Sequence, residues 1–101
     1  MPEVLVLQFA DLTIDPVAMY RSVSDLIGID VDTGTGDWPA GLLDHSAATA
    51  DGAFVVVERW ASRADHDAFM ATRLAPAFAE AHTPPPVKVS WYTEIGHKND
   101  G

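Results

Sequence analysis

The feature that most constrains the fold is a hairpin signal in the middle of the chain. Residues 41–48 and 53–60 flank the dipeptide Asp51-Gly52, whose backbone tolerates the positive φ angles of a two-residue turn. The second segment is rich in β-branched and aromatic residues, as strands usually are. The sequence therefore predicts two antiparallel strands joined by a tight turn.

A two-residue turn also sets the register of this hairpin. The predicted cross-strand pairs are Ala50 with Ala53, His45 with Glu58, Asp44 with Arg59, and Leu43 with Trp60. Because side chains alternate along a strand, one face carries Leu43, His45, Val56, Glu58 and Trp60, and the other carries Asp44, Val55, Val57 and Arg59. The register therefore places an imidazole beside a carboxylate on one face and an opposite-charge pair on the other.

An apolar strand and an amphipathic helix precede the hairpin. Residues 4–9 form a short aliphatic run, which predicts a strand with apolar contacts on both faces. Asp15 can accept a backbone N–H at a helix start, and Pro16 suits the first helical position. The helical pattern, which includes Val17, then ends at Gly28, a natural C-terminal cap.

A long irregular segment connects this helix to the hairpin. Residues 29–40 have neither helical nor strand periodicity, and we expect a loop. Trp38 stands out in it, because an indole in a loop generally has a contact to make. Gly34 and Gly36 lie among aspartates, which repel phosphate, so a phosphate-binding loop is not predicted.

A second helix follows the hairpin. Ser62 and Asp65 resemble a capping box at its start. The pattern directs Phe69, Leu74 and Phe78 inward and places His66 among the polar residues of the helix. Pro76 removes an internal N–H bond, so we expect a kink or two short helices over residues 74–77.

A last strand ends the fold. Residues 84–86 are three prolines, which make a stiff extended connector. Residues 87–95 read as a strand with Val87, Val89 and Trp91 on one face. We expect residues 96–101 to form a flexible tail.

The element order β-α-β-β-α-β predicts an α+β, ferredoxin-like domain over residues 1–101. In this plan both helices cover one face of a four-stranded antiparallel sheet. The other face stays open, and the first and third strands are apolar on both sides. Because a large exposed apolar sheet face usually marks an interface, we expect a homodimer packed sheet to sheet.

The composition narrows the choice of partners. Fifteen acidic residues against six basic ones give a formal net charge of −9, which disfavours binding to nucleic acid or to an anionic membrane. No apolar run approaches the roughly 20 residues that span a bilayer, and no cysteine is present. No histidine pair has the spacing of a metal site. We expect a cytoplasmic protein without a bound metal.

Two stretches resemble a known family. Residues 51–62 are similar to the third strand and helix start of the dimeric α/β-barrel superfamily, which includes antibiotic-biosynthesis-monooxygenase-like (ABM-like) domains. Phe69 and the later run 74–78 are similar to the second helix of many small members, and the likeness covers about residues 4 to 95. The resemblance implies a homodimer whose sheets form a barrel, with a cleft between helices and sheet in each subunit.

The activities of this family range widely. Characterised members include cofactor-independent oxygenases of polycyclic aromatic substrates, haem-degrading enzymes, and isomerases or decyclases, and many members have no known activity. This chain departs from both oxygenase patterns. Val56 stands where the quinone-forming oxygenases have an asparagine. Gln8, Phe69 and Ala79 stand where the haem-degrading members have Asn, Trp and His, with His82 nearby but off register.

His45 opposite Glu58, with Trp60 on the same face, is the best candidate for chemistry. A neighbouring carboxylate favours the imidazolium and fixes its tautomer, which suits a general base or acid, and Trp60 can stack on a flat substrate. The same residues also fit a structural cross-strand pair beside a core tryptophan. The pair of Asp44 and Arg59 is compatible with a position in a dimer interface or at a solvent-exposed edge of the sheet. Alternatively, Arg59 binds a carboxylate of the substrate.

Aromatic residues could complete a pocket under the long loop. The candidates for substrate binding, besides Trp60, are Tyr20, Trp38, Trp91 and His82. Core packing explains Tyr20 and Trp91 equally well.

The sequence therefore supports two hypotheses. The first is an enzyme that performs oxygenation or proton transfer on a small hydrophobic or aromatic molecule without a tightly held cofactor. The second is a non-catalytic dimeric module for ligand binding or assembly.

Overall fold

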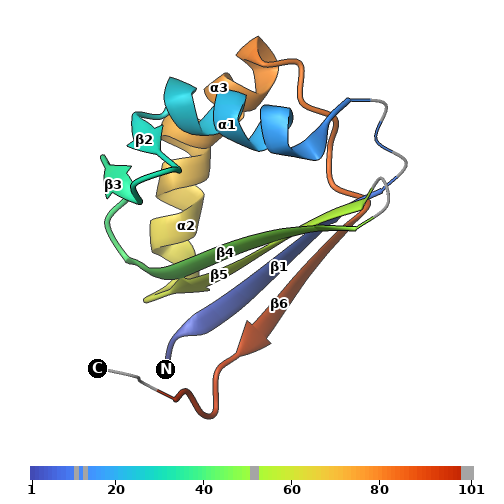
Figure 1. The fold of residues 1–101 in the computed structure, drawn as a ribbon. Helices are drawn as coiled ribbons and strands as arrows, with labels where there is room; N and C mark the ends of the chain where they lie inside the picture. The colour runs from blue at the N-terminus through green and yellow to red at the C-terminus, as the bar shows by residue number, and fades with distance from the viewer. Residues whose placement is uncertain (11, 13, 51–52, 99–101) are drawn as a thin grey trace.

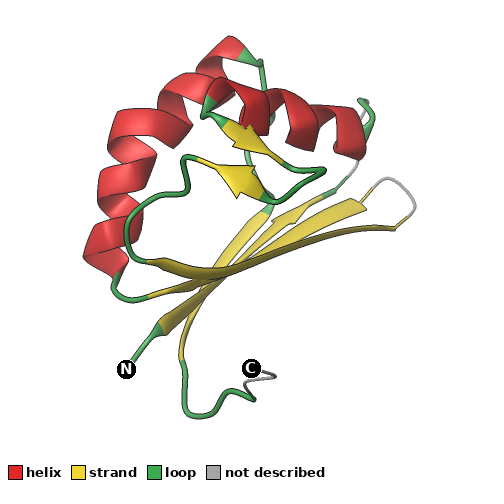
Figure 2. Cartoon of the chain, turned by 60° about the vertical axis from the view of Figure 1, so that its left-hand side comes forward, coloured by secondary structure: helices red, strands yellow, loops and turns green. Residues whose placement is uncertain are grey.

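The computed structural model describes residues 1–10, 12, 14–50 and 53–98, and it has the predicted α+β, ferredoxin-like architecture. Helices cover one face of an antiparallel sheet and leave the other face open (Figures 1 and 2). In chain order the elements are β1 (Glu3–Phe9), α1 (Pro16–Leu26), β2 (Ile29–Asp30), β3 (Thr35–Gly36), β4 (Leu42–Ala50), β5 (Ala53–Trp60), α2 (Arg63–Phe69), η1 (Met70–Leu74), α3 (Ala75–Glu80) and β6 (Lys88–Thr93).

The main sheet has the strand order β4-β5-β1-β6, with all neighbours antiparallel. The core lies between this sheet and the helices. Alternation along β1 and β5 directs one set of side chains into it, namely Leu5, Leu7, Phe9, Phe54, Val56, Glu58 and Trp60, all of which are buried. The β6 residues that pair with Leu5 and Leu7 are Trp91 and Val89, which lie on the same side of the sheet.

The hairpin register is confirmed over most of its length. His45 pairs with Glu58, Asp44 with Arg59, and Ala50 with Ala53, whereas the predicted turn at Asp51 and Gly52 lies outside the described residues. The predicted partner of Trp60 is wrong. A bulge between Leu42 and Asp44 makes Leu42 the partner of Trp60 and leaves Leu43 about half exposed. The extra residue restores an apolar side chain to the core side of the strand.

Helix α1 begins and ends as its sequence predicts. The Asp15 carboxylate accepts the backbone N–H of Val17 at 3.0 Å, and Pro16 is the first helical residue. Gly28 follows the C-cap with a φ of 82°, a left-handed conformation that glycine adopts without strain. Met19, Val23 and Ser24 form the buried stripe, whereas Val17 is exposed.

The second helix is continuous but contains a wide turn. Ser62 caps it by accepting the Asp65 N–H at 3.2 Å. Residues Met70–Leu74 form the π-helical turn η1, where the N–H of Ala75 bonds to the carbonyl of Met70, five residues back. Because Pro76 has no N–H to donate and its ring crowds the preceding turn, widening that turn relieves the conflict without a sharp break. The expected kink is therefore a π-helical turn just before the proline.

Two segments differ from the sequence prediction. The expected loop 29–40 contains a short two-stranded sheet, in which Ile29 pairs with Gly36 and Asp30 with Thr35. His66, placed among the polar residues of the helix, is buried. The last strand, predicted over 87–95, spans residues 88–93.

The face of the sheet opposite the helices carries several apolar side chains. Pairing and alternation place Val4, Val6, Val55, Val57 and Tyr92 on this open face, and Val57 and Tyr92 are exposed. Within the described part of the chain, the helices are all too short or too polar to cross a bilayer.

Candidate functional site

A cavity of about 70 Å³ lies between the sheet and the helices. Its wall is mainly apolar and consists of Leu7, Phe9, Met19, Val23, Ile27, Ile29, Trp38, Pro39, Leu42, Phe54, Val56, Phe69, Leu74 and Phe78. The remaining lining residues are Tyr20, Ser24, His45, Glu58 and Thr83. A cavity needs about 10–15 Å³ to hold one water, so this one has room for a small molecule or its head group. Two ionisable side chains in such a surrounding require an explanation.

His45 and Glu58 are neighbours in this cavity. Strand pairing sets their backbones side by side, and His45 Nε2 lies 3.5 Å from Glu58 Oε2. The side chain of His45 is 14% exposed and that of Glu58 is 7% exposed. The sequence-based pairing of these two residues is therefore observed, on the side of the sheet that the helices cover.

Trp60 holds the other oxygen of Glu58. Its indole Nε1–H donates to Glu58 Oε1 at 3.1 Å, within the core. The Trp60 ring is fully buried and packs on Phe69 and edge-on against His66. Trp60 does not line the cavity, so its predicted role as a stacking platform does not fit this structure, and its contact is with the carboxylate instead.

Tyr20 approaches His45 from the helix side. Its hydroxyl lies 3.4 Å from His45 Nδ1, and the two rings are nearly parallel with centroids 5.8 Å apart. With Glu58 as an acceptor at Nε2, the neutral imidazole fits its surroundings as the Nε2–H tautomer, and Nδ1 then accepts a hydrogen bond from the Tyr20 hydroxyl. Burial raises the pKa of Tyr20, and the charge of Glu58 raises it further, so this phenol stays protonated at neutral pH.

The protonation of His45 differs from the sequence-based expectation. Burial lowers the pKa of His45, and this effect outweighs the carboxylates of Glu58 and Asp44, which raise it. The expectation that the neighbouring carboxylate would favour the imidazolium is therefore wrong in its net result. At neutral pH His45 is a neutral base whose Nδ1 lone pair is directed to Tyr20.

The other aromatic candidates divide into two groups. Trp38 lines the cavity, and its ring lies 5.6 Å from that of His45. Trp91 lies elsewhere, edge-on against His66 and beneath the guanidinium of Arg63. His82 is exposed in the turn after α3 and has a φ of 53°. The structure thus brings Tyr20 and Trp38 to His45, but not Trp91 or His82.

The sequence reasoning missed two polar residues of the cavity. Ser24 and Thr83 are not among the site residues that the sequence predicts, yet both line the cavity. The hydroxyl of Thr83 is buried and has no hydrogen-bond partner among the described residues. Their position between α1, α3 and the sheet depends on tertiary packing, for which the sequence carries no local signal.

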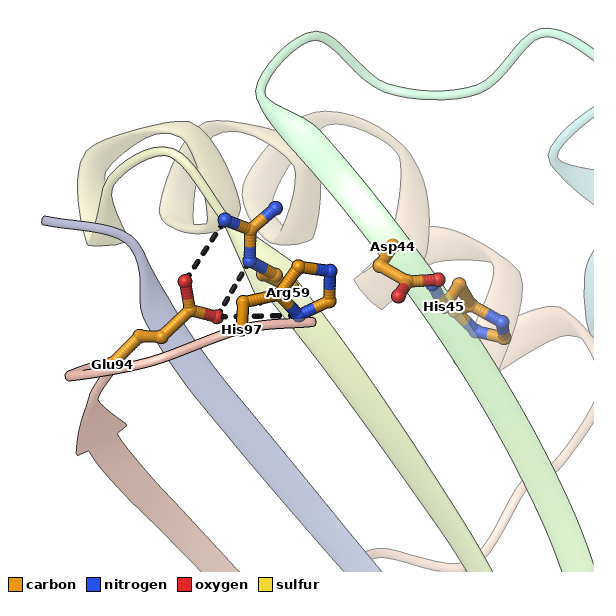
Figure 3. A network of polar contacts seen from close by, with 5 residues as sticks. All are labelled: Asp44, His45, Arg59, Glu94 and His97. Carbon is orange, nitrogen blue, oxygen red and sulfur yellow. Dashed lines mark hydrogen bonds and ion pairs between the residues drawn. The ribbon is translucent and has the colours of Figure 1, made fainter. Parts of the chain in front are cut away.

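Arg59 and Asp44 are neighbours in register but do not pair. The Arg59 guanidinium instead binds Glu94 with two bonds, Nε to Oε2 at 2.6 Å and Nη2 to Oε1 at 2.9 Å (Figure 3). This contact lowers the pKa of Glu94 and raises that of Arg59. His97 approaches the same carboxylate at 4.0 Å. The predicted Asp44–Arg59 pair is replaced by an ion pair to the end of the last strand.

The described residues contain no cluster of side chains that could bind a metal ion. No group of three or more His, Asp or Glu side chains in residues 1–10, 12, 14–50 and 53–98 is placed to hold an ion. The polar groups of the cavity are a carboxylate, an imidazole, a phenol and two aliphatic hydroxyls. This set is suited to hydrogen bonding and proton transfer.

Comparison with known proteins shows the fold. No protein-family model and no curated protein matches the sequence. Among solved structures, a candidate antibiotic biosynthesis monooxygenase from Chloroflexus aurantiacus J-10-fl is 14% identical with a TM-score of 0.68, and each chain is covered over 100% of its length. A protein of unknown function from Nitrosomonas europaea, NE2512, is 15% identical with a TM-score of 0.69, over 99% of this chain and 95% of that one.

An enzyme of known class has the same fold. A variant of SnoaB, a cofactor-independent oxygenase from Streptomyces nogalater, is 10% identical with a TM-score of 0.66, and the match covers 95% of each chain. At these identities the likeness is one of fold. The chain therefore has the same fold as these proteins, which is the fold that the resemblance of residues 51–62 and the element order predicted.

Proposed function

We propose that this protein is a cofactor-independent enzyme that removes a proton from a small hydrophobic or aromatic molecule, with His45 as its general base. The observation that carries the proposal is the buried His45–Glu58 pair in a mainly apolar cavity. An apolar wall selects a hydrophobic ligand, and a lone cluster of polar groups selects the position of its reactive atom.

Each polar residue has a role in this reaction. The ligand's acidic hydrogen passes to His45 Nδ1, and the electron pair of the broken bond stays on the ligand. Glu58, at 3.5 Å from Nε2, stabilises the imidazolium that forms. The Tyr20 hydroxyl, released from Nδ1, donates to the developing anion. Trp60 acts through Glu58 as a positioning residue.

The same deprotonation opens a monooxygenase-like route. Dioxygen, as the co-reactant, adds to the carbanion and takes up a proton to give a hydroperoxide. When its O–O bond breaks, one oxygen atom stays on the ligand as a carbonyl, and the other leaves as water with the second hydrogen of that carbon. The likeness to a cofactor-independent oxygenase supports this route. Val56 stands where the family resemblance places an asparagine in the quinone-forming oxygenases. We therefore assign residues of this chain to the proton transfer only, and propose oxygenation as a step that follows it.

The alternative is a module that binds a small ligand without turning it over. This reading is favoured by the internal partners of the site, since both His45 nitrogens and both oxygens of Glu58 already face protein groups. A structural pair of this kind would give binding without proton transfer.

We also propose that the open face of the sheet joins a second copy of the chain. Val57 and Tyr92 are exposed on this face beside half-buried Val4, Val6 and Val55. Among the described residues the centre of this face is formed by Val4, Val6, Val55 and Val57. An apolar surface of this kind suits a two-fold interface, in which the same patch covers itself. The ionic pair Arg59–Glu94 then lies at the rim.

Base-catalysed deuterium exchange tests the enzymatic proposal without a known substrate. A series of apolar ketones from cyclohexanone to 2-tetralone is incubated in D₂O, and loss of the α-hydrogen signal is followed by NMR. The wild-type protein should accelerate exchange of at least one ketone, and His45→Gln should reduce that acceleration about 10²–10⁴-fold. His97→Gln, at an exposed histidine outside the cavity, should leave it unchanged. Ketones that bind but exchange equally with wild type and His45→Gln would establish the binding module instead.

A further inference from the structure

The segment between α1 and β4 closes on itself next to the cavity. The backbone N–H of Asp37 donates to the carbonyl of Gly28 at 2.9 Å, which joins the two ends of residues 28–37. Gly36 has a φ of 136°, and a Cβ there would lie 2.4 Å from the Gly28 oxygen. This close approach requires glycine. Residues 28–38, here termed the cover segment, thus form one closed unit that Figure 2 shows over the helix side of the sheet.

Arg73 holds both ends of the cover segment. Its Nη2 donates to the carbonyl of Ile27, just before the segment, and to the carbonyl of Asp37 at 2.6 Å, near its end. The Asp37 carboxylate lies 3.6 Å from the same nitrogen, and the guanidinium lies over the Phe69 ring at 5.3 Å. One side chain therefore bridges two backbone carbonyls that are ten positions apart in the chain.

The wide turn of the second helix carries this residue. Arg73 belongs to η1, the π-helical turn that precedes Pro76. A π-helical turn shifts the direction of the side chains on it relative to an α-helix, and such turns occur frequently at functional sites. The local sequence conflict at Pro76 is thus linked to the placement of Arg73.

Trp38 connects the cover segment to the site. It follows Asp37 directly, its indole Nε1–H donates to the Gly34 carbonyl at 2.9 Å, and its ring lies 5.6 Å from His45. Trp38 and Ile29 are both part of the cavity wall. Trp38 is 36% exposed, so one part of the indole faces solvent while another covers the imidazole.

We propose that Arg73 is a positioning residue that keeps Trp38 over His45 and thereby excludes water from the base. The proposal rests on the proposed function, because it concerns access to the same imidazole. Release of Arg73 frees both ends of the cover segment at once and exposes His45 to solvent. The other groups that face His45, namely Glu58, Asp44 and Tyr20, belong to α1 or the sheet and stay in place.

NMR on the ligand-free protein tests this proposal independently of any reaction. In Arg73→Met, solvent exchange of the Trp38 indole N–H should accelerate about tenfold or more, and the pKa of His45 should rise toward its ordinary value of 6.5. Arg21→Met is the matched control, since Arg21 binds Asp32 of the same segment at 2.7 Å but both side chains are exposed. It should change neither quantity. An Arg73→Met protein with wild-type exchange and wild-type His45 pKa would overturn the proposal.

A double variant separates positioning from a general loss of stability. If Arg73 acts through Trp38, Trp38→Ala should raise the His45 pKa as Arg73→Met does, and the combined variant should match Trp38→Ala alone. Additive pKa changes would contradict this mechanism. Where Arg73→Met does not fold, Arg73→Lys retains the charge but loses the forked donor, and it should shift the same two quantities by a smaller amount. These outcomes do not depend on catalysis, so they are expected even if the protein accelerates deuterium exchange of none of the ketones.

Discussion

Trp60 donates its indole N–H to Glu58 at 3.1 Å, and this bond directs the other carboxylate oxygen to His45. Both residues are buried, so the bond replaces hydration that the carboxylate lost on folding. Trp60→Phe keeps an aromatic ring but leaves Glu58 Oε1 unpaired. The free energy of unfolding, measured by urea denaturation, should fall by about 2–4 kcal/mol. Trp91→Phe, the same change at a tryptophan outside the cavity, should preserve the His45 pKa, whereas Trp60→Phe should change it.

The charge of Glu58 opposes the effect of burial on His45. Glu58→Gln removes the charge at nearly constant volume, so the pKa of His45 should fall further below its ordinary value. Asp44→Asn should lower the same pKa by less, because Asp44 contributes less than Glu58. Titration of the imidazole signals by NMR gives both values. A His45 pKa that rises in Glu58→Gln would show that Glu58 does not face the ring in solution.

The lowered pKa of His45 links protonation to stability. The unfolded chain binds a proton at this residue near pH 6.5, whereas the folded protein binds it only at lower pH. The free energy of unfolding should therefore decrease as pH falls below about 6.5, by at most about 1.4 kcal/mol per pH unit. His45→Gln should remove this contribution, so the difference between the two proteins isolates it. A wild-type protein that gains stability relative to His45→Gln as pH falls would contradict the assignment.

The open face of the sheet should control the oligomeric state. Val57→Asp places a charge on this face, and the proposed dimer should dissociate to monomers in sedimentation-velocity experiments. Val89→Asp is the control, because Val89 is also exposed but pairs with Leu7 on the helix side of the sheet. It should leave the mass unchanged. A wild-type protein that sediments as a monomer would remove this proposal while leaving the cavity chemistry in place.

The sequence predicts the His45–Glu58 contact because turn length and alternation are local rules. Ala50 pairs with Ala53, and counting outward from this pair along both strands brings His45 to Glu58. The same counting fails at Leu43, since an inserted residue in a strand leaves no mark in the alternation until the partner strand is known. The bond between Trp60 and Glu58 joins residues two apart on one face, so the same rule could have found it.

Contacts between distant elements lie outside such rules. Tyr20 reaches His45 because α1 packs on the face of the sheet that carries this imidazole. Arg59 on β5 binds Glu94 because the chain that follows β6 lies across β1 from it. Burial at His45 follows from the same packing. For this reason the sequence predicted the partner of the imidazole but not the direction in which its pKa moves.

The protonation state of His45 is the central claim, and it can be measured directly. A long-range ¹H–¹⁵N correlation spectrum at pH 7 distinguishes the two neutral tautomers of an imidazole from its cation. The structure predicts a neutral ring with the proton on Nε2 and an unprotonated Nδ1, ready to accept a proton from a ligand in the cavity. A cation at pH 7, or a ring protonated on Nδ1, would contradict the role of His45 as a base.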